Sequence, residues 1–491
     1  MAQPFALDRF LPLLNSCCTL QDGVLVSSSA AEGTFEVLNP ATQEVIARLA
    51  NQTAADTEEA IDRAEAALPA WRAMPAKSRS ALLKQWFALI QQHADDLALL
   101  MTLEQGKPVA EALGEVQYGA SFIEWFAEEA KRAYGEVIPS PMSNRRLVTV
   151  RQGIGVVAAI TPWNFPNAMI TRKVAPALAA GCTIVLKPSE ETPLSAIALL
   201  TLAREAGIPE EVFQLVMSTR AADIGDVMCH DSRVRKLTFT GSTPVGKLLM
   251  RQCADTVKKL GLELGGNAPF IVFDDADIDA AIKGLMLAKF RNAGQTCICA
   301  NRVLVQDGIY DTFAERLAQA MDALTVGNGT EQGITTGPLI NERAVAKVER
   351  LVNEAREAGA KVIRGGQRDS SGQGFYVPTL VTQATADMSL CREEIFGPVA
   401  PLIRFSTEEE AVAIANDTPF GLAAYFYSRD IGRAWRVGEA LEYGMVGINE
   451  GGISNEVAPF GGVKESGLGR EGSRHGLEEF MEIKYLCMGG V

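Results

Sequence analysis

The stretch GVVAAITPWNFPNAMITRKVAPALAAGCTIVLKPSE, residues 155–190, decides the fold. It begins with a short apolar run, continues through a helical pattern over residues 170–181, and ends in a second apolar run, TIVLK. The alternation continues through PLSAIALLTLAREAG, FQLVM and KLTFT up to Thr240. Apolar runs bounded by Gly and Pro and alternating with helices predict a parallel sheet covered on both faces. A nucleotide-binding domain is the natural candidate.

The same alternation resumes after Gly265 with PFIVF, a helix over residues 277–294 and the strand RVLVQ, and further helices reach about Ala440. This pattern predicts a second α/β domain. The junction at residues 263–266 falls between the two predicted sheets, where ligands tend to bind in such folds. The first 130 or so residues show helical periodicity, as in residues 57–71 and 78–103, and we expect those apolar stripes to form core.

Length and charge narrow the function. A chain of 491 residues is too long for a single hydrophobic core, so two or three domains are expected. The 46 Lys and Arg residues against 60 Asp and Glu give a formal charge of −14, which repels phosphate backbones and anionic membranes. We therefore expect no nucleic-acid partner and no membrane partner, and an anionic substrate would need a local cationic pocket.

The N-terminus and the cysteines indicate the compartment. The first residues lack a basic region, and Asp8 and Arg9 interrupt the apolar stretch, so no signal peptide is predicted. No apolar run reaches the roughly 18 residues that span a bilayer. Nine cysteines, an odd number, do not form a secreted disulfide framework, and the three histidines do not sit at ligand spacing with a Cys pair. A cytoplasmic protein without a metal site is expected.

The segment KLTFTGSTPVGK joins a predicted strand to a helix through Gly241. Ser242 or Thr243 serves as the cap, Pro244 lies in the first turn, and Gly246 allows close packing. A pyrophosphate fits such a helix N-terminus. The spacing is not GxGxxG, so a capped helix without a ligand stays as the alternative.

A second cofactor signal is TIVLKPSEE, which ends a buried strand with Lys187, Ser189 and Glu190 at its carboxyl edge. A dinucleotide ribose binds at this place in wound sheets. A carboxylate accepts both ribose hydroxyls and would repel a 2′-phosphate, so Glu190 favours NAD over NADP. The alternative is a solvated Lys187–Glu190 surface pair.

The segment FRNAGQTCICANR places Cys297 among small and polar residues, after a helix that carries Lys289 and Arg291. With so few histidines, a thiol nucleophile here would need a carboxylate or a water-relayed base. Glu263 fits that need, because it ends a predicted strand next to two glycines. The alternatives are an inert buried cysteine and a salt-bridged glutamate.

Seven ordered motifs together resemble the aldehyde dehydrogenase superfamily, and the match runs from about Asn39 to EIKY near the C-terminus. They are ITPWNFP, LKPSE, FTGSTPVG, LELGGNAP, GQTCICANR, EEIFGP and PFGGVKESGLGREG. The resemblance implies a Rossmann-like cofactor domain over residues 1–130 and 152–262 and an α/β catalytic domain over 263–470. It also implies a small β oligomerisation arm over 131–151 and 471–491, in a homodimer or homotetramer.

Carried over motif by motif, the resemblance implies the following roles. Cys297 is the nucleophile, Asn164 and the Cys297 N–H form the oxyanion hole, Glu263 is the general base, and Glu471 belongs to a proton relay. Lys187 and Glu190 hold the adenosine ribose beside Ser189. Trp163 and Ser242, with Gly241 and Gly246, line the pyrophosphate region, and Glu394 and Phe396 position the nicotinamide ribose and ring.

Within the superfamily, MITRK, the CxC of Cys297 and Cys299, EYGMVGIN and SNEVAPFGG look most like succinate-semialdehyde and glutarate-semialdehyde dehydrogenases. In that family two arginines and a serine grip the distal carboxylate, and Arg172, Arg291 and Ser454 match them. Succinate semialdehyde is the first expected substrate and glutarate semialdehyde the next. A broad-specificity aldehyde dehydrogenase, and more remotely a cysteine esterase or a structural protein, are the alternatives.

Two further expectations concern regulation and cofactor choice. Cys299 is a candidate for a disulfide with Cys297 that would mask the nucleophile, although so short a loop is strained. The stretch QLVMSTRAADIG lacks the glycine that relatives carry just after that strand, which affects the adenine edge of the pocket. Both cofactors stay open, with NAD preferred.

Overall fold

A computed structural model describes residues 7–14, 17–28 and 33–491. Its first large sheet has the strand order β19-β11-β10-β7-β8-β9 and is parallel except at β19. The strands are β7 Val156–Ile160, β8 Thr183–Lys187, β9 Phe213–Leu215, β10 Val234–Thr240, β11 Lys259–Glu263 and β19 Gly467–Leu468. The predicted parallel sheet around residues 155–240 is confirmed.

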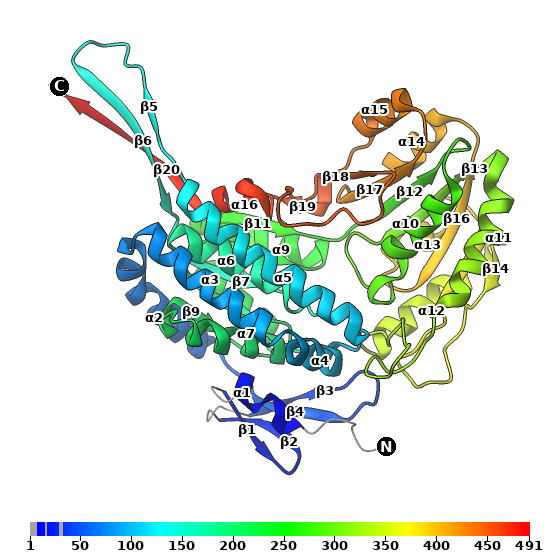
Figure 1. Ribbon diagram of the computed structural model, residues 1–491, viewed down its shortest axis with the longest axis horizontal. Coiled ribbons are helices and arrows are strands. Elements are labelled where there is room, and N and C mark those ends of the chain that lie inside the picture. Colours follow the sequence, from blue (N-terminus) through cyan, green and yellow to red (C-terminus); the bar gives the residue numbers. More distant parts are fainter. Residues whose placement is uncertain (1–6, 15–16, 29–32) are drawn as a thin grey trace.

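Helices cover both faces of this sheet (Figure 1). Apolar side chains of α3–α7 pack in one cluster with Val157 and Ile184, while those of α2, α8 and α9 pack with Val156 and Val185 on the opposite face. The helices are α2 Ala54–Ala73, α3 Ala76–Gln92, α4 Ala94–Gln105, α5 Val109–Glu129, α6 Ala168–Ala180, α7 Pro193–Glu205, α8 Ala221–His230 and α9 Thr243–Cys253. Consecutive strand residues point to opposite faces, so continuous apolar runs are what a doubly covered sheet requires.

The second large sheet has the order β14-β15-β16-β13-β12-β17-β18 and is parallel except at β14. Its strands are β12 Ala268–Val272, β13 Ala300–Gln306, β14 Lys361–Arg364, β15 Thr379–Ala384, β16 Val399–Phe405, β17 Ala423–Tyr427 and β18 Met445–Ile448. Its helices are α10 Ile278–Phe290, α11 Tyr310–Ala320, α12 Glu342–Glu357, α13 Ser389–Arg392, α14 Glu408–Asn416 and α15 Ile431–Ala440. The predicted second α/β unit is confirmed.

The two sheets meet end to end. Strand β11 ends at Glu263 and the chain enters β12 at Ala268, so the carboxyl edge of the first sheet faces the amino edge of the second. Cys297 lies just before β13, and Phe396 lies just before β16. Loops that leave one sheet therefore meet loops that enter the other, and this junction creates the candidate site.

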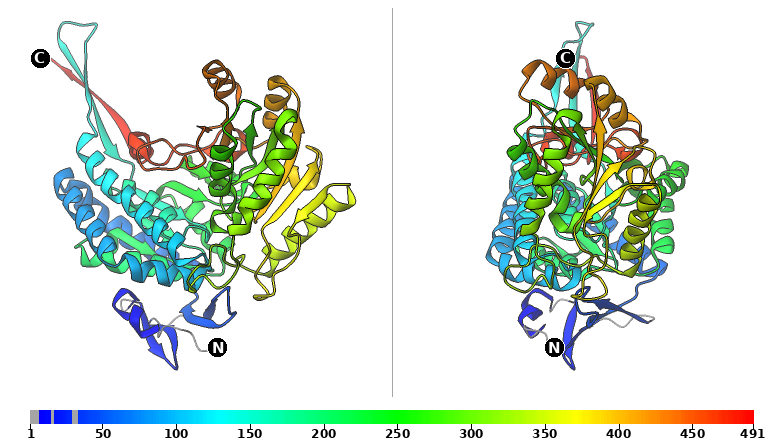
Figure 2. Two further views of the ribbon diagram at one scale, coloured as in Figure 1. Left: turned by 45° about the vertical axis from the view of Figure 1, so that its right-hand side comes forward. Right: turned by 90° about the vertical axis from the view of Figure 1, so that its right-hand side faces the viewer.

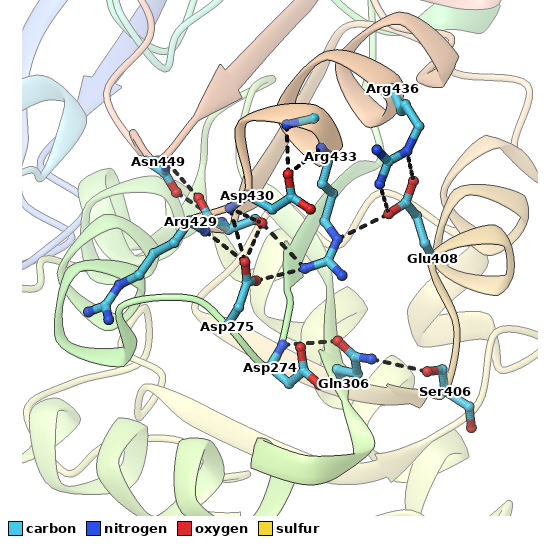
Figure 3. Close-up of polar contacts among 12 residues, drawn as sticks. Asp274, Asp275, Gln306, Ser406, Glu408, Arg429, Asp430, Arg433, Arg436 and Asn449 are labelled. Carbon is cyan, nitrogen blue, oxygen red and sulfur yellow. Dashed lines mark hydrogen bonds and ion pairs between the residues drawn. The ribbon is translucent and has the colours of Figure 1, made fainter.

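A polar network closes the opposite, carboxyl edge of the second sheet (Figure 3). The Asp275 carboxylate, just after β12, accepts hydrogen bonds from the backbone N–H groups of Arg429 and Asp430, each at 3.0 Å. Arg433 of α15 donates to Asp275 at 2.7 Å and to Glu408 of α14 at 3.0 Å. Half-buried, shared charges of this kind join the ends of several strands and hold α14 and α15 on the sheet.

The described residues within 18–50 depart from the sequence expectation, which found the first 130 or so residues rich in helical pattern. They form a four-stranded sheet of order β1-β2-β4-β3, with bounds β1 Cys18–Gln21, β2 Val24–Ser27, β3 Thr34–Leu38 and β4 Val45–Ala50. Asp22 and Gly23 both have positive φ, 49° and 77°, and join β1 to β2 in a two-residue turn. An Asp-Gly dipeptide between apolar runs is a hairpin signal that outweighs weak helical periodicity.

A three-stranded ribbon projects from the body and carries the C-terminus (Figures 1 and 2). Its order is β20-β6-β5, with bounds β5 Glu136–Ile138, β6 Arg145–Gly153 and β20 Met481–Gly489, all antiparallel. Val137 is 78% exposed and Ile483 is 64% exposed.

None of the helices in the described ranges is long and apolar enough to span a bilayer.

Candidate active site

A cavity of about 450 Å³ lies at the junction of the two sheets. Seven residues singled out from the sequence line it, namely Trp163, Asn164, Gly241, Ser242, Cys297, Glu394 and Phe396. They come from loops after β7 and β10 and from loops before β13 and β16. The end-to-end contact of the sheets thus brings together residues that are far apart in the chain.

The loop that carries Cys297 is held in an uncommon conformation. Asn292, Ala293 and Gly294 all have positive φ, 52°, 52° and 75°, which costs about 1 kcal/mol or more for a residue other than glycine. A Cβ at Gly266 would come within 2.5 Å of the Cys297 carbonyl oxygen. The second glycine of LELGG is therefore required for the approach of the Cys297 loop to β12.

Asn164 lies against the same loop. Its Nδ2 donates to the Gln295 carbonyl at 2.9 Å, and Lys107 Nζ donates to the Asn164 carbonyl at 2.8 Å. An amide nitrogen carries two hydrogens, so this contact leaves the second N–H for another acceptor. Asn164 is only 5% exposed, so that N–H faces protein and cavity and has little access to bulk water.

Burial governs the acidity of the Cys297 thiol. Its pKa is raised to about 12, mainly by desolvation, with Arg172 acting to lower it and Glu263 and Glu394 acting to raise it. At neutral pH the thiol therefore holds its proton, and attack by sulfur requires a nearby base.

Glu263 and Glu471 form a buried carboxylate pair behind that thiol. Burial and the neighbouring Glu471 raise the pKa of Glu263 well above its usual range, and Glu263 Oε2 has no hydrogen-bond partner among the described residues. Burial also acts to raise the pKa of Glu471, but Lys173 and Arg172 outweigh it and the net shift is downward. One carboxyl is thus held ionised by cations while the other readily takes up a proton.

The residues expected to hold the cofactor form two groups, one at the start of α9 and one at the end of β8. Ser242 is the N-cap residue of α9, yet its side chain makes no capping hydrogen bond, and the Thr243 hydroxyl donates to the Glu465 carbonyl at 3.2 Å instead. This corrects the expected side-chain cap. Thr240 also lines the cavity, and its buried hydroxyl has no partner among the described residues.

At the far end of that edge, Lys187 Nζ lies 3.4 Å from Glu190 Oε2, and Lys187 is buried. The Ser189 hydroxyl accepts from the Glu191 N–H at 3.3 Å. A Cβ at Gly246 would meet Leu264 at 2.4 Å, which agrees with the close packing expected there.

Glu394 and Phe396 lie on the opposite wall. Glu394 accepts from the Gly266 N–H at 3.1 Å, and burial raises the pKa of its carboxyl to about 7. Phe396, with φ of 55°, packs edge-on against Trp163 with ring centroids 5.6 Å apart. Two aromatic rings in contact and a carboxylate therefore line this part of the cavity.

The two candidate substrate arginines differ in their partners. Arg172 is 1% exposed, its Nη2 forms an ion pair with Glu471 Oε2 at 2.8 Å, and its guanidinium lies 3.9 Å from the Phe460 ring centroid. Its Nε has no hydrogen-bond partner in the described part of the chain. Arg291 is half-buried and stands 5.2 Å from the Phe165 ring centroid. No described residue forms a hydrogen bond or an ion pair with the Arg291 side chain.

Two smaller cavities lie beside Arg291. Phe165 lines both the main cavity and a cavity of about 200 Å³, which Arg291 and Tyr118 also line. Arg291 in turn lines a third cavity, of about 70 Å³, with Ser454. Tyr118 links Ser454 to Arg172, because its hydroxyl is hydrogen-bonded to Ser454 Oγ and accepts from Arg172 Nη1 at 3.4 Å.

Sequence reasoning missed Thr240, Tyr118 and Lys173. Thr240 lay within a quoted motif and Lys173 within MITRK, so their positions were available but not their orientation. Tyr118 lies in a helix whose periodicity indicated only core. The second thiol, Cys299, is buried and does not line the main cavity, and Lys289 Nζ donates to its sulfur at 3.2 Å.

An α/β fold of two sheets, with a partly buried thiol that lines the cavity at their junction, defines the class of protein. The family model for the aldehyde dehydrogenase family matches residues 26–486, and the chain belongs to that family of oxidoreductases. The resemblance drawn from the seven motifs is thereby confirmed.

Individual relatives narrow the comparison. The chain is 60% identical to a 3-sulfolactaldehyde dehydrogenase of Pseudomonas putida, over 96% of each chain. It is 59% identical to a succinate-semialdehyde dehydrogenase [NADP(+)] of Escherichia coli (strain K12), over 93% of this chain and 94% of that one. Its fold matches the crystal structure of a succinate-semialdehyde dehydrogenase from Burkholderia pseudomallei with a TM-score of 0.94 and 56% identity, over 100% of this chain and 99% of that chain.

Proposed function

We propose that this chain oxidises a short ω-carboxylated aldehyde to the dicarboxylic acid, with succinate semialdehyde as the first candidate and glutarate semialdehyde as the next. The observation that carries this proposal is the pair of arginines beyond the thiol cavity. Arg172 keeps a buried Nε–H without a hydrogen-bond partner among the described residues, while its Nη2 is ion-paired with Glu471, and Arg291 forms no hydrogen bond or ion pair with a described residue. Unpaired buried donors are costly, and a substrate carboxylate would satisfy them. Succinate-semialdehyde dehydrogenases among the similar proteins support the same reading.

The cavity also fits a nicotinamide dinucleotide. Thr240 presents a buried hydroxyl without a partner, and a Cβ at Gly241 would meet the Phe239 ring at 2.4 Å, so the turn before α9 stays free of side chains. Gly241 and Ser242 would hold the pyrophosphate, Lys187 and Glu190 the adenosine ribose, and Glu394 with Phe396 the nicotinamide end. When bound, this group supplies the hydride acceptor. We propose NAD as the preferred form and NADP as a second form.

The protein's own residues would then perform the chemistry. Glu263 removes the proton of Cys297, directly or through water, and the sulfur attacks the aldehyde carbon. The Cys297 N–H and the second N–H of Asn164 stabilise the alkoxide of the thiohemiacetal. After the hydride has left, the thioester on Cys297 is hydrolysed by a water that Glu263 activates.

Glu471 would assist the proton balance of these steps. It is held ionised by Lys173 and Arg172, and its negative charge raises the proton affinity of Glu263. A base whose pKa is raised toward neutrality both accepts a proton from a thiol and releases it afterwards. We therefore assign Glu263 as the general base and Glu471 as the residue that tunes it.

The test is the initial rate of NADH and of NADPH formation with succinate semialdehyde, glutarate semialdehyde and an uncharged aldehyde of matched length. The proposal expects a much lower KM for the two carboxylated substrates. Equal KM values for the uncharged aldehyde would assign the arginines to structure and leave a broad-specificity aldehyde dehydrogenase. The absence of turnover with every aldehyde would contradict the catalytic assignment of Cys297.

A sulfonated aldehyde is the second candidate substrate. The relative from Pseudomonas putida that is 60% identical is named a 3-sulfolactaldehyde dehydrogenase. Arginine donors grip a sulfonate as readily as a carboxylate, because both present anionic oxygens in a compact group. A kcat/KM for 3-sulfolactaldehyde above that for succinate semialdehyde would make the sulfonate the preferred substrate.

We also propose the domain division expected from the resemblance, with residues 131–151 and 471–491 as an oligomerisation arm. Exposed apolar side chains on this ribbon, among them Val137, Ile483 and Tyr485, support burial against a second copy. Sedimentation of an Ile483→Lys, Tyr485→Lys double variant should give a smaller species than the parent. Glu482→Ala, on the opposite side of β20, should leave the dimer or tetramer intact.

A further inference from the structure

The second cysteine of the catalytic loop has an unusual neighbour. Lys289 of α10 is fully buried, and its Nζ donates to Cys299 Sγ at 3.2 Å. Cys299 is the only hydrogen-bond partner of that ammonium nitrogen among residues 7–14, 17–28 and 33–491. A buried lysine is ordinarily paired with a carboxylate or several carbonyls, so contact with sulfur alone is exceptional.

The two thiols of the CxC segment face different surroundings. Cys297 lines the main cavity with Asn164, whereas Cys299 does not line it. The Cys299 sulfur instead lies 3.5 Å from the Lys289 carbonyl oxygen, and the Cys299 N–H donates to the Thr296 carbonyl at 3.1 Å. This turn directs Cys299 into α10, away from the side of the loop that carries the Cys297 sulfur.

We propose that Lys289 and Cys299 form a covalent modification site, at which oxidation joins Nζ and Sγ through one oxygen atom. The reactants are the Lys289 amine, which forms when the ammonium gives up one proton, the thiol and dioxygen. Nζ and Sγ each lose one hydrogen, one oxygen atom forms the N–O and O–S bonds, and the other leaves as water with both hydrogens. The lysine–cysteine pair is oxidised and dioxygen is reduced, and a thiol reductant reverses the bridge.

Formation of the bridge would make the turnover of the enzyme sensitive to oxidation. It draws Nζ and Sγ closer than their present contact and fixes the loop two residues beyond Cys297. The nucleophile itself stays a thiol, so the bridge would alter the position of Cys297 and would not consume it. The expected result is a severalfold fall in turnover that dithiothreitol restores.

The experiment is peptide mass spectrometry of the full-length protein after incubation in aerated buffer and, in parallel, under anaerobic dithiothreitol. The bridge predicts a linked product that is one oxygen heavier and two hydrogens lighter than the reduced peptides, with fragments that place the link at Lys289 and Cys299. Trypsin should also fail to cleave after Lys289. Cys391, another buried thiol, is the internal control because no described lysine donates to it.

Three variants separate the outcomes. Lys289→Met and Cys299→Ala should each abolish the linked product, whereas Cys297→Ala should retain it, because the nucleophile takes no part. A Cys297–Cys299 disulfide in the aerated parent and in Lys289→Met, without any product heavier by oxygen, would overturn the proposal. Sulfinic acid on Cys299 as the sole oxidation product would overturn it as well.

Discussion

The thiol end and the arginine end of the candidate site are built in different ways. At the thiol end, backbone and glycine decide the geometry: Gly266 admits the Cys297 carbonyl, and Asn164 is hydrogen-bonded to the Gln295 carbonyl at 2.9 Å. At the arginine end, long side chains decide the geometry, and Tyr118 links Arg172 to Ser454 through hydrogen bonds of its hydroxyl.

This difference indicates which end can change. Backbone-built geometry tolerates few substitutions, because a shift of a few tenths of an ångström breaks several contacts at once. A side-chain cluster can exchange one partner for another with little backbone movement. Relatives that share the family but are named for a carboxylated and a sulfonated aldehyde agree with a fixed reaction end and an adjustable recognition end.

The largest effect is expected at the thiol. Cys297→Ala removes the atom that bonds to the substrate, so kcat should fall by about four orders of magnitude or more. Steady-state NADH formation measures this loss. The matched control is Cys299→Ala in the same loop, which should keep most of the activity under reducing conditions. Comparable activity in the Cys297→Ala protein would break the assignment of the reaction end.

The carboxyl pair should control the pH dependence. Burial and Glu471 raise the pKa of Glu263, and a general base acts only when ionised, so kcat/KM should rise as the pH increases through that raised pKa. Glu263→Gln should lower kcat by about 10²–10⁴-fold and remove this limb of the profile.

Glu471→Gln sharpens the same experiment. It removes a negative charge beside Glu263 and leaves Lys173 and Arg172 in place, so the pKa of Glu263 should fall. The rising limb of kcat/KM should then move to lower pH. A limb that stays at the same pH in this variant would contradict the proposed coupling of the two carboxyls.

These carboxyls also illustrate what a sequence predicts. Glu263 and Cys297 stand at a strand end and in a glycine-flanked turn, and such positions follow from local pattern and from motif order. The ion pair of Lys173 with Glu471 joins residues 298 positions apart, so it depends on how the C-terminal segment packs on α6. No periodicity of either segment encodes that contact.

For the fold as well, features set by local sequence could be predicted, whereas features set by contacts between distant segments could not. The alternation of apolar runs and helices predicts both sheets, because each βαβ unit is specified within about 30 residues. The end-to-end placement of the sheets and the polar network at Asp275 depend on contacts across the chain. Tyr118 was missed for this reason, since only its neighbours in space distinguish it from core.

The two arginines provide a test of the recognition end. Arg291→Met should raise KM for carboxylated aldehydes by about 10–100-fold, the loss of a charged hydrogen bond of about 1.5–3 kcal/mol, and should leave an uncharged aldehyde and the Tm little changed. Arg172→Met should also lower the Tm, because it leaves Glu471 buried with one cation fewer. KM values for both substrates and thermal unfolding of both variants measure the contrast. If the two variants show the same changes in KM and Tm, the ion pair of Arg172 with Glu471 does not distinguish it from Arg291.

The smallest effect is expected at the adenosine end, where the Glu190 side chain is 41% exposed and lies 3.4 Å from Lys187. Glu190→Ala removes an acceptor for two ribose hydroxyls and a charge that repels a 2′-phosphate. The ratio of kcat/KM for NAD to that for NADP should therefore fall by about tenfold. Glu191→Ala is the matched control, because Glu191 accepts from Asn341 at 3.0 Å and forms no hydrogen bond or ion pair with Lys187 in the described structure. If both variants keep the parent ratio, cofactor choice is set elsewhere on this edge, and the stretch at residues 214–225, which lacks the usual glycine, becomes the segment to exchange.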